Sequence, residues 1–368
     1  MQTAAKNQSR FFLFLVALLA GFGFFIFLSA SLGMIGTNMA GFIHIGLKQL
    51  AVLAGSLVLM LVLANIPYRL WREYSLPILI AGIIATAIIF IPGLGISAGG
   101  ATRWLNLGLF SIQPAELLKL GLVMYYAAWL TRAKDKAGTL WSGLAPMLVL
   151  LGIAGILLIQ QPDIGTFIVI ASALATQYFV AGGKWRHFLG LFFVAILVLG
   201  CLAIAMPYVR DRITTFFNSD KDVLNSAYQI NQSLIAIGSG GLSGRGFGQS
   251  LQKFNFLPQP IGDSIFAVAG EEFGFIGTMI ILILFLLFAV YGLKIASGSR
   301  DSFGGLLATG LVILIISQSF ANIGAMLGLI PLTGEPLIFV SQGGSALLFG
   351  LSAVGIILNI SRYQKHSN

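Results

Sequence analysis

Cysteine, histidine and charged residues are scarce in this chain of 368 residues. Cys201 is the only cysteine and lies in an apolar run, which excludes an internal disulfide or a cysteine-based metal site. The three histidines, His44, His187 and His366, are far apart in the sequence, so a histidine-based metal site is not predicted. Only 9% of the residues are charged, against about 25% in a typical soluble domain. The composition therefore indicates a chain whose solvent is largely lipid.

Long apolar runs take the place of the missing charge, and 57% of the residues are hydrophobic. The hydrocarbon core of a bilayer needs about 20 apolar residues per helix. We therefore predict an all-α, polytopic membrane protein with one transmembrane domain over residues 1–368. Its ten predicted spans lie near 11–31, 46–65, 74–92, 114–132, 141–160, 164–182, 187–206, 265–293, 303–326 and 341–361. The first run is too long for a signal-peptide core and no small-residue cleavage site follows it, so we expect it to be retained.

The distribution of lysine and arginine predicts the orientation of these spans. With a cytoplasmic N-terminus, thirteen of the 21 basic residues fall in short inner segments, against Lys48 and Arg103 in short outer ones. Short inner loops rich in basic residues are the usual pattern of membrane proteins. Both termini are therefore predicted to be cytoplasmic. The net charge of +9 is explained by the same loops, and we do not predict nucleic-acid binding because no soluble basic domain is present.

One long outer segment, 207–264, separates the seventh and eighth spans. Its residues 222–238 are amphipathic and predict a helix at the membrane surface. The glycine-rich stretch that follows, SGGLSGRGFGQS, has no lysine at the P-loop position and follows no strand, so it is not a nucleotide-binding motif. We expect this large extracytoplasmic loop to pack over the helices rather than form a separate domain.

Charged residues at the ends of spans are functional candidates, because charge is costly in a bilayer. Glu116 and Lys119 are separated by three positions and share one helix face. Asp163 begins the sixth span and Asp263 the eighth. Each has a structural alternative: the two aspartates could be helix N-caps, and Glu116 with Lys119 could form a structural ion pair. Glu271 and Glu272 are adjacent, hence about 100° apart on a helix, and do not face one substrate.

The even-numbered spans all run from outside to inside, so their N-termini share the outer face. Helix N-termini carry partial positive charge and free N–H groups. Four such ends, at Pro114, Asp163, Ser264 and Gly343, are predicted to open on the face that carries Arg103 and Arg245. That face is suited to bind phosphate or pyrophosphate. Asp263 and Glu271 would lie roughly 12 Å apart along a helix, too far for the two-carboxylate chemistry of glycosidases.

Five blocks in the correct order resemble the SEDS family, the FtsW/RodA/SpoVE proteins of bacterial cell-wall synthesis. They are GATRWLNLG…QPAELLKL (100–120), QPDIGT (161–166), YQINQSLIAIGSGGLSGRGFGQSLQKFNFLP (228–258), DSIFAVAGEEFGFIG (263–277) and PLTGEPLIFVSQGGSALL (331–348). The resemblance covers nearly the whole chain. It implies a peptidoglycan glycosyltransferase that polymerises lipid II at the outer face of the cytoplasmic membrane, and division septum synthesis is favoured over elongation.

The resemblance also implies roles for particular residues. Asp263 matches the essential loop aspartate of the family and is our candidate catalytic base. The candidate substrate-binding residues are Arg103, Trp104, Glu116, Lys119, Gln161, Asp163, Arg245, Lys253, Ser264, Ser341, Gly343 and Gly344. Three motifs depart from the family pattern. Thr102 replaces the first arginine of the RRWL-type motif, and Gln259, Ile261, Gly262 and Ser264 differ in PQPIGDSIF. In the last block the differences are Ile338, Gln342 and Ala346, with Glu335 just before them. We expect them to affect substrate positioning more than the reaction type.

The resemblance further implies partners and leaves two other functions open. A class B penicillin-binding protein, a transpeptidase, is the expected partner, with other membrane proteins of the division machinery beside it. No cofactor is firmly expected, although a divalent cation such as Mg or Mn could accompany the pyrophosphate. A lipid II flippase is the main alternative, because transporters are also many-span bundles with intramembrane charges. A scaffold without activity is the other, against which the retained Asp263, Arg103 and Lys119 argue.

Overall fold

The computed structural model is a bundle of long helices. It describes residues 2–34, 39–98, 101–106, 108, 111–217 and 226–364. Each predicted span corresponds to a helix, and the ten helices are α1 (Gln2–Ser31), α2 (Met39–Asn65), α3 (Leu70–Ile88), α4 (Pro114–Ala133), α5 (Ala145–Gln160), α6 (Ile164–Val180), α7 (Trp185–Ala205), α10 (Ile265–Ser297), α11 (Ser302–Met326) and α12 (Gly344–Ser361). A π-helical turn, η3 (Leu140–Leu144), extends α5 at its start.

Eight helices in the described part of the chain are long and apolar enough to cross a membrane. The two remaining predicted spans are α4 and α6. Helix α6 has 17 residues, and α4 carries Glu116 and Lys119 near its start. Both pack against α11 inside the bundle. The chain is therefore a multi-pass membrane protein, and the figure of ten crossings stays a prediction.

Helices α11 and α12 form the centre of the bundle and α7 its periphery. Most residues of α11 and α12 are buried, whereas α7 has no buried residue. Helix α12 packs on α2, α11 on α6 and α10, and α3 on α4. The apolar residues of α7 are exposed because lipid is their solvent. The polar side chains of the central helices are therefore the ones that the fold shields from water.

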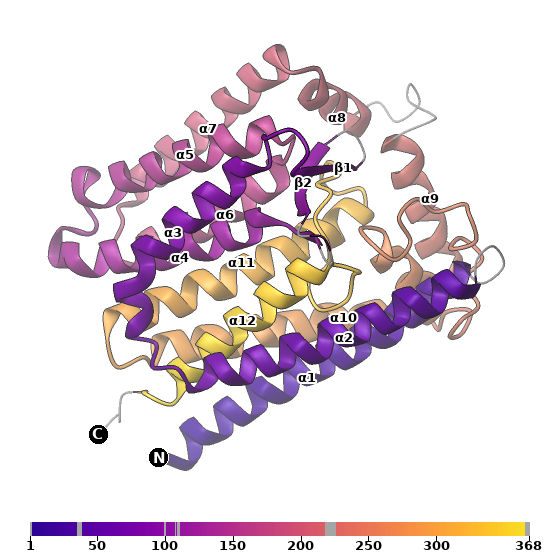
Figure 1. The fold of residues 1–368 in the computed structure, drawn as a ribbon, viewed down its shortest axis with the longest axis horizontal. Helices are drawn as coiled ribbons and strands as arrows, with labels where there is room; N and C mark the ends of the chain where they lie inside the picture. The colour runs from indigo at the N-terminus through magenta and orange to yellow at the C-terminus, as the bar shows by residue number, and fades with distance from the viewer. Residues whose placement is uncertain are drawn as a thin grey trace.

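The two ends of the bundle differ in what they carry (Figure 1). The first turns of α1 and the last turns of α12 lie together at one end, where the hydroxyls of Ser9 and Ser361 are 3.0 Å apart. The strands and two short helices, α8 (Pro207–Phe217) and α9 (Ser226–Ser239), lie at the other end. Helix α9 agrees with the amphipathic helix predicted over 222–238, whose first four residues lie outside the described ones. Within the described part of the long loop, α9 packs against α10 and α11.

A small antiparallel sheet joins α3 to α4 and was not predicted. Its strands, β1 (Gly95–Ala98), β2 (Ala101–Asn106) and β3 (Ser111–Ile112), lie in the order β1-β2-β3. Trp104 pairs with Ile96 and Leu105 with Ile112. Strands this short give little periodicity in the sequence. The sheet matters because it carries Arg103 to the start of α6.

Helix α10 is broken near its start, where a continuous span was predicted. Gly274 has φ 65° and ψ −163°, a conformation open to glycine. The part from Phe275 to Ser297 is about 34 Å long at 1.5 Å per residue, which suffices to cross a bilayer core of about 30 Å. The turns from Ile265 to Phe273 therefore form a separate segment before the crossing. Glu271 and Glu272 belong to that segment and not to the crossing.

The glycine-rich loop supplies the hydrogen bonds that the break removes. The backbone N–H of Arg245 donates to the carbonyl of Glu271, and that of Gly246 donates to the carbonyl of Glu272. Each N···O distance is 3.0 Å. In the other direction, Phe275 N donates to Gly241 O over 2.8 Å. A Cβ at Gly244 would come within 2.1 Å of Glu272 O. The glycines are therefore explained by close packing of two backbones.

Candidate active site

Four helix N-termini converge at the end of the bundle opposite the chain termini, as the alternation of spans predicts. Gln113, just before α4, donates from its backbone to Ser345 Oγ of α12 over 2.9 Å. Its side-chain amide lies 3.5 Å from Asp163 Oδ2 at the start of α6. Ser341, before α12, donates to Gly262 O over 2.8 Å in the segment that leads into α10. Hydrogen bonds therefore hold the starts of α4, α6, α10 and α12 together.

The charged groups at this end meet around Gly334. A Cβ built on Gly334 would lie 3.5 Å from Arg103 Nη1, 3.7 Å from Arg212 Nη2 and 3.9 Å from Asp263 Oδ2. Gly334 has φ 71°, which a residue with a side chain rarely adopts. Two cations and one carboxylate therefore border one small space that glycine leaves open. We call Arg103, Asp163, Arg212, Asp263 and Glu335 the site cluster.

The space is a cavity of about 100 Å³. It is lined by Arg212, Gln229, Asp263, Asn322, Ala325, Met326, Leu332, Thr333, Gly334 and Glu335. The Asn322 amide donates to the backbone carbonyls of both Asp263 and Glu335 over 2.8 Å. These two hydrogen bonds from one side chain set the spacing of the two acidic residues across the cavity.

Asp163 and Arg103 form the side of the site cluster nearest α6. Arg103 Nη1 lies 3.9 Å from Asp163 Oδ1, and its other nitrogens donate to the carbonyls of Gln161 and Pro162. Asp163 also accepts from the backbone and hydroxyl of Thr166, at 3.4 and 3.0 Å. The N-cap interpretation of Asp163 is therefore confirmed, and the ion contact comes in addition. Asp263 makes no such capping bond to α10 in the described residues.

Burial and the two arginines act in opposite directions on Asp263. Burial raises the pKa of the Asp263 carboxyl, and the charges of Arg103 and Arg212 offset only part of that rise. Burial lowers the pKa of the Arg212 guanidinium, and the nearby Arg103 charge lowers it further. Arg212 donates to Leu332 O over 2.6 Å and lies 4.4 Å above the Tyr208 ring. Crowded cations that share one carboxylate favour the binding of a further anion.

Glu116 and Lys119 form the predicted ion pair, 2.8 Å long, beneath the site cluster. Lys119 Nζ also lies 2.6 Å from Gln318 Oε1 on α11. Both side chains are buried. The hydrogen bond from Lys119 to Gln318 joins α4 to α11, and the buried charges of the pair act on the nearby cavity. The structural interpretation of this pair and a role in the site are compatible.

The other predicted residues take supporting positions. Successive side chains of a strand alternate between faces, so Trp104 faces away from the side on which Arg103 meets Asp163. Ser264 accepts a hydrogen bond from the cavity residue Gln229 over 3.0 Å. Gln161 donates to Thr86 O over 3.1 Å. Gly343 and Gly344 begin α12 through their backbone alone.

The family model of the FtsW, RodA and SpoVE proteins, described as cell cycle protein, matches residues 9–366. The chain belongs to this family. Curated relatives include a probable peptidoglycan glycosyltransferase FtsW of Geobacter metallireducens, 40% identical over 83% of this chain and 82% of the relative. Stage V sporulation protein E of Bacillus subtilis is 38% identical over 87% of each chain.

Solved structures of family members share the fold. A chain from a structure on the coordination of polymerization and crosslinking by a peptidoglycan synthase complex matches with a TM-score of 0.79, 27% identity and coverage of 95% and 96% of the two chains. The rod shape determining protein RodA of Thermus thermophilus matches with a TM-score of 0.71 at 26% identity, over 97% of each chain. The predicted polytopic family fold is thereby confirmed.

Two predicted FtsW/RodA-type site residues, Arg245 and Lys253, lie in a second cluster instead, which is built around two buried glutamates. Lys253 Nζ lies 2.7 Å from Glu272 Oε1, and Arg245 Nε lies 3.5 Å from Glu271 Oε1. Ser29 of α1 donates to Glu272 over 2.5 Å. We call Ser29, Arg245, Lys253, Glu271 and Glu272 the Gly274 cluster. The structure pairs these cations with two buried glutamates beside the break in α10, and neither cation lines the cavity beside Gly334. Their role in substrate binding stays a prediction.

Sequence reasoning missed Arg212, Gly334 and Asn322, and it named Glu335 only beside the differences from the family pattern. Gly334 and Glu335 lie inside the quoted PLTGEPLIF block, but a loop sequence does not indicate which side chains reach a cavity. Arg212 was assigned only to the long loop. The signal that could have identified it is its position on α8, whose polar and apolar residues alternate as on a helix lying against another surface. Asn322 is a single polar residue in an apolar span, and the sequence does not indicate that its side chain faces the cavity.

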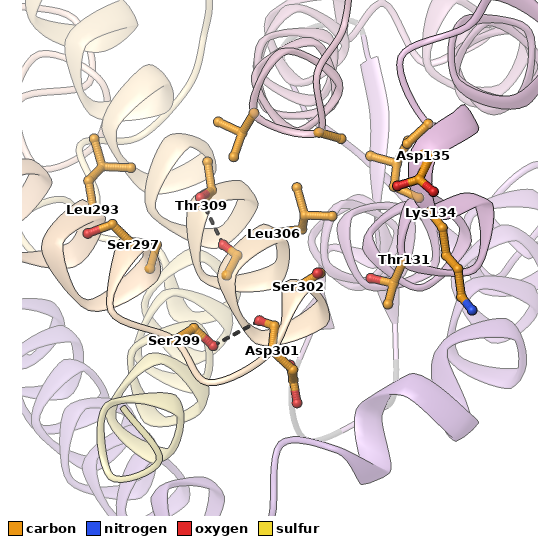
Figure 2. Close-up of a pocket in the computed structure, with 16 residues that line it drawn as sticks. Thr131, Lys134, Asp135, Leu293, Ser297, Ser299, Asp301, Ser302, Leu306 and Thr309 are labelled. Carbon is orange, nitrogen blue, oxygen red and sulfur yellow. Dashed lines mark hydrogen bonds between the residues drawn. The ribbon is translucent and has the colours of Figure 1, made fainter. Parts of the chain in front are cut away.

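A larger cavity, of about 810 Å³, lies at the other end of α11 (Figure 2). Thr131, Lys134, Asp301 and Ser302 line it. Several of its hydroxyl groups donate to nearby backbone carbonyls, as Thr309 does to Gly305 O over 2.8 Å and Ser299 to Asp301 O over 3.2 Å. No pair of cations borders a free carboxylate in the described lining, and the site cluster is therefore the better candidate for chemistry.

The described residues contain no group of three or more His, Cys, Asp or Glu side chains arranged to hold a metal ion. The divalent cation considered above stays a prediction. Its test is polymerisation before and after a chelator, with added Mg²⁺ or Mn²⁺ as the restoring control.

Proposed function

We propose that this chain polymerises lipid II into glycan strands at the outer face of the bacterial cytoplasmic membrane. The observation that carries the proposal is the placement of Arg103, Arg212 and Asp263 around the space beside Gly334. The Asp263 carboxylate has no hydrogen-bond donor among the described residues, so it is available to a substrate. The relatives named peptidoglycan glycosyltransferase support the same activity.

In the proposed reaction, the 4-hydroxyl of an acceptor sugar attacks the anomeric carbon of the donor. The bond from that carbon to the lipid pyrophosphate breaks, and the hydroxyl proton passes to the Asp263 carboxylate. The raised pKa of Asp263 makes it a better proton acceptor than an ordinary aspartate. Arg103 and Arg212 would neutralise the charge that gathers on the leaving pyrophosphate.

The test is polymerisation of lipid II by purified protein in detergent. Asp263→Asn keeps the shape but removes the base, and we expect the rate to fall by about 10²–10⁴-fold, the usual contribution of a general base. Asp211→Asn is the matched control, because Asp211 is an exposed aspartate of α8. Polymerisation by Asp263→Asn within threefold of the unchanged protein would refute the assignment.

The same assay separates polymerisation from transport. Growth of glycan chains in detergent needs no compartments, whereas flipping of lipid II requires a sealed vesicle. A protein that moves labelled lipid II across vesicles and makes no polymer in detergent would be a flippase. The position of the site cluster at one end of the bundle favours chemistry at one membrane surface.

We assign the chain to the division branch and to a class B penicillin-binding protein as its partner. The FtsW relatives are 35–40% identical, and the RodA structure is 26% identical. The neighbouring structure of a peptidoglycan synthase complex supports a partner enzyme. Depletion should block septation and leave filaments, whereas loss of an elongation enzyme gives round cells. Polymerisation with and without the cognate transpeptidase tests the partner.

A further inference from the structure

Thr166 connects two buried carboxyl groups with a single hydroxyl hydrogen. Its Oγ1 lies 2.6 Å from Glu335 Oε1 and 3.0 Å from Asp163 Oδ2. A hydroxyl donates one hydrogen, and an ionised carboxylate can only accept. If both carboxylates were ionised, the hydroxyl hydrogen of Thr166 could bond to one of them, and the other carboxylate oxygen would touch Thr166 Oγ1 with no hydrogen between the two oxygens. One of the two carboxyl groups must therefore carry a proton and donate it to Thr166.

The surroundings of the two carboxyl groups indicate which one holds the proton. Asp163 faces the Arg103 guanidinium, the Thr166 backbone N–H and the Gln113 amide. All three stabilise an ionised group. Glu335 is 2% exposed, and Thr166 is its side chain's one hydrogen-bond partner within the described ranges. The proton therefore belongs to Glu335.

Lys119 does not reverse this assignment. Its ammonium donates to Glu116 over 2.8 Å and to Gln318 over 2.6 Å, and among the described residues it makes no hydrogen bond to Glu335. Burial raises the pKa of Glu335 to about 8, the negative charges of Asp163 and Glu116 act in the same direction, and Lys119 opposes them. The hydrogen count and the electrostatics therefore agree.

We propose that Glu335 is a positioning residue that acts as a neutral carboxylic acid, donating to Thr166 so that Thr166 donates to Asp163. This inference rests on the proposed polymerase function. Asp163 fixed in this way holds Arg103 at the edge of the cavity. Glu335 also lines that cavity with Arg212 and Asp263, so its ionisation would place a negative charge where a pyrophosphate is expected. The neutral acid keeps both cations free for that anion.

The decisive variant is Glu335→Gln, because a glutamine amide has the same shape, can donate to Thr166 and never ionises. In lipid II polymerisation by purified protein we expect the unchanged enzyme to lose rate above about pH 8, roughly tenfold per pH unit for one titrating group. The sign follows from the active neutral form, which disappears as the pH rises through the pKa of Glu335. Glu335→Gln should lose the alkaline decline, so that its rate, measured relative to its own rate at pH 7, stays level as the pH rises.

Two outcomes of this assay would overturn the proposal. One is an alkaline decline that persists unchanged in Glu335→Gln, which would mean that another group titrates. The other is a loss of polymerisation by Glu335→Gln at every pH as severe as that of Asp263→Asn. Glu73→Gln, at an exposed glutamate of α3, is the matched control and should keep the profile of the unchanged enzyme.

An infrared measurement tests Glu335 without any activity. The carbonyl stretch of a protonated carboxyl group should be present in the purified protein at pH 7, shift in D₂O and disappear in Glu335→Gln but not in Glu73→Gln. Absence of that band at pH 7 would overturn the proposal even if the enzyme polymerises lipid II. Presence of the band in a protein that makes no polymer would sustain the protonation of Glu335 and refute the polymerase function instead.

Discussion

The two buried acidic clusters contain similar residues but differ in how their carboxylate oxygens are bound. In the Gly274 cluster, Glu271 accepts from Ser250 Oγ and from the backbone of Leu251 and Gln252, at 2.5–3.2 Å. Glu272 accepts from Ser29 and Lys253. In the site cluster, the Asp263 carboxylate has no donor among the described residues, and Thr166 is the one hydrogen-bond partner of the Glu335 side chain there.

This difference separates a structural role from a functional one. Ionisable residues in membrane proteins are functional candidates by default, and that rule alone does not distinguish Glu272 from Asp263. The inventory of hydrogen-bond donors does, because a carboxylate that the fold has fully bound has nothing left to offer a substrate. The Gly274 cluster holds a broken helix to α1 and the glycine-rich loop, and the site cluster leaves Arg212, Asp263 and Glu335 facing a cavity.

Lys253→Met should have the largest effect, and it should act on folding. The substitution leaves the buried Glu272 carboxylate without its cation, which costs about 3–5 kcal/mol in measured cases. We expect a sharp fall in the thermal unfolding temperature in detergent, with polymerisation per folded molecule unchanged. The double variant Lys253→Met with Glu272→Gln should recover much of the loss. A stable Lys253→Met protein without polymerisation would place Lys253 in the site after all.

Gly334→Ala should reduce polymerisation by about 100-fold, equal to about 2.7 kcal/mol in the transition state. Its methyl group would occupy the space that Arg103, Arg212 and Asp263 border at 3.5–3.9 Å. Gly182→Ala is the matched control, because Gly182 has φ 94° with nothing within 4 Å of an added Cβ. Both variants carry the backbone cost of positive φ, about 1–2 kcal/mol. Equal activity in the two would mean that substrate does not use this space.

The amino-acid sequence is sufficient to predict the helices and the end of the bundle that carries the site. Apolar runs predict spans because each must satisfy its backbone within lipid, and alternation of direction places every second N-terminus on one face. Asp163 and Asp263 are therefore predicted to lie at the same end from the order of the spans alone. The orientation of the spans places Arg103 on the same outer face, and the resemblance to the family added a substrate-binding role for it.

The break in α10 and the occupants of the cavity could not be predicted. An apolar run through Gly274 has the same periodicity whether or not the helix is broken there, so Arg245 and Lys253 were assigned to a substrate rather than to Glu271 and Glu272. Gly334 matters through its φ angle and its distance from three side chains on other elements. Such contacts between distant segments depend on tertiary packing and leave no local signal in the sequence.

Arg212→Lys should lower kcat/KM for lipid II by about tenfold, or about 1.4 kcal/mol. Lysine keeps the charge but loses the planar group that lies over Tyr208 and donates to Leu332 O. Arg210→Lys is the control, because Arg210 is exposed on the same helix. The cluster comparison would be weakened if Arg212→Lys lowered the unfolding temperature as much as Lys253→Met while leaving kcat/KM unchanged.

Arg245→Gln should have the smallest effect, because the Arg245 side chain is 37% exposed and lies 3.5 Å from Glu271. Ion pairs at such positions contribute about 0–1 kcal/mol, and the other donors to Glu271 remain in place. We expect polymerisation within twofold of the unchanged enzyme and a small fall in the unfolding temperature. Arg103→Gln, measured beside it, should lose far more activity, because Arg103 borders the space beside Gly334. A tenfold loss of polymerisation in a stable Arg245→Gln protein would show that substrate reaches the Gly274 cluster, and the separation of the two clusters by their hydrogen-bond donors would then fail.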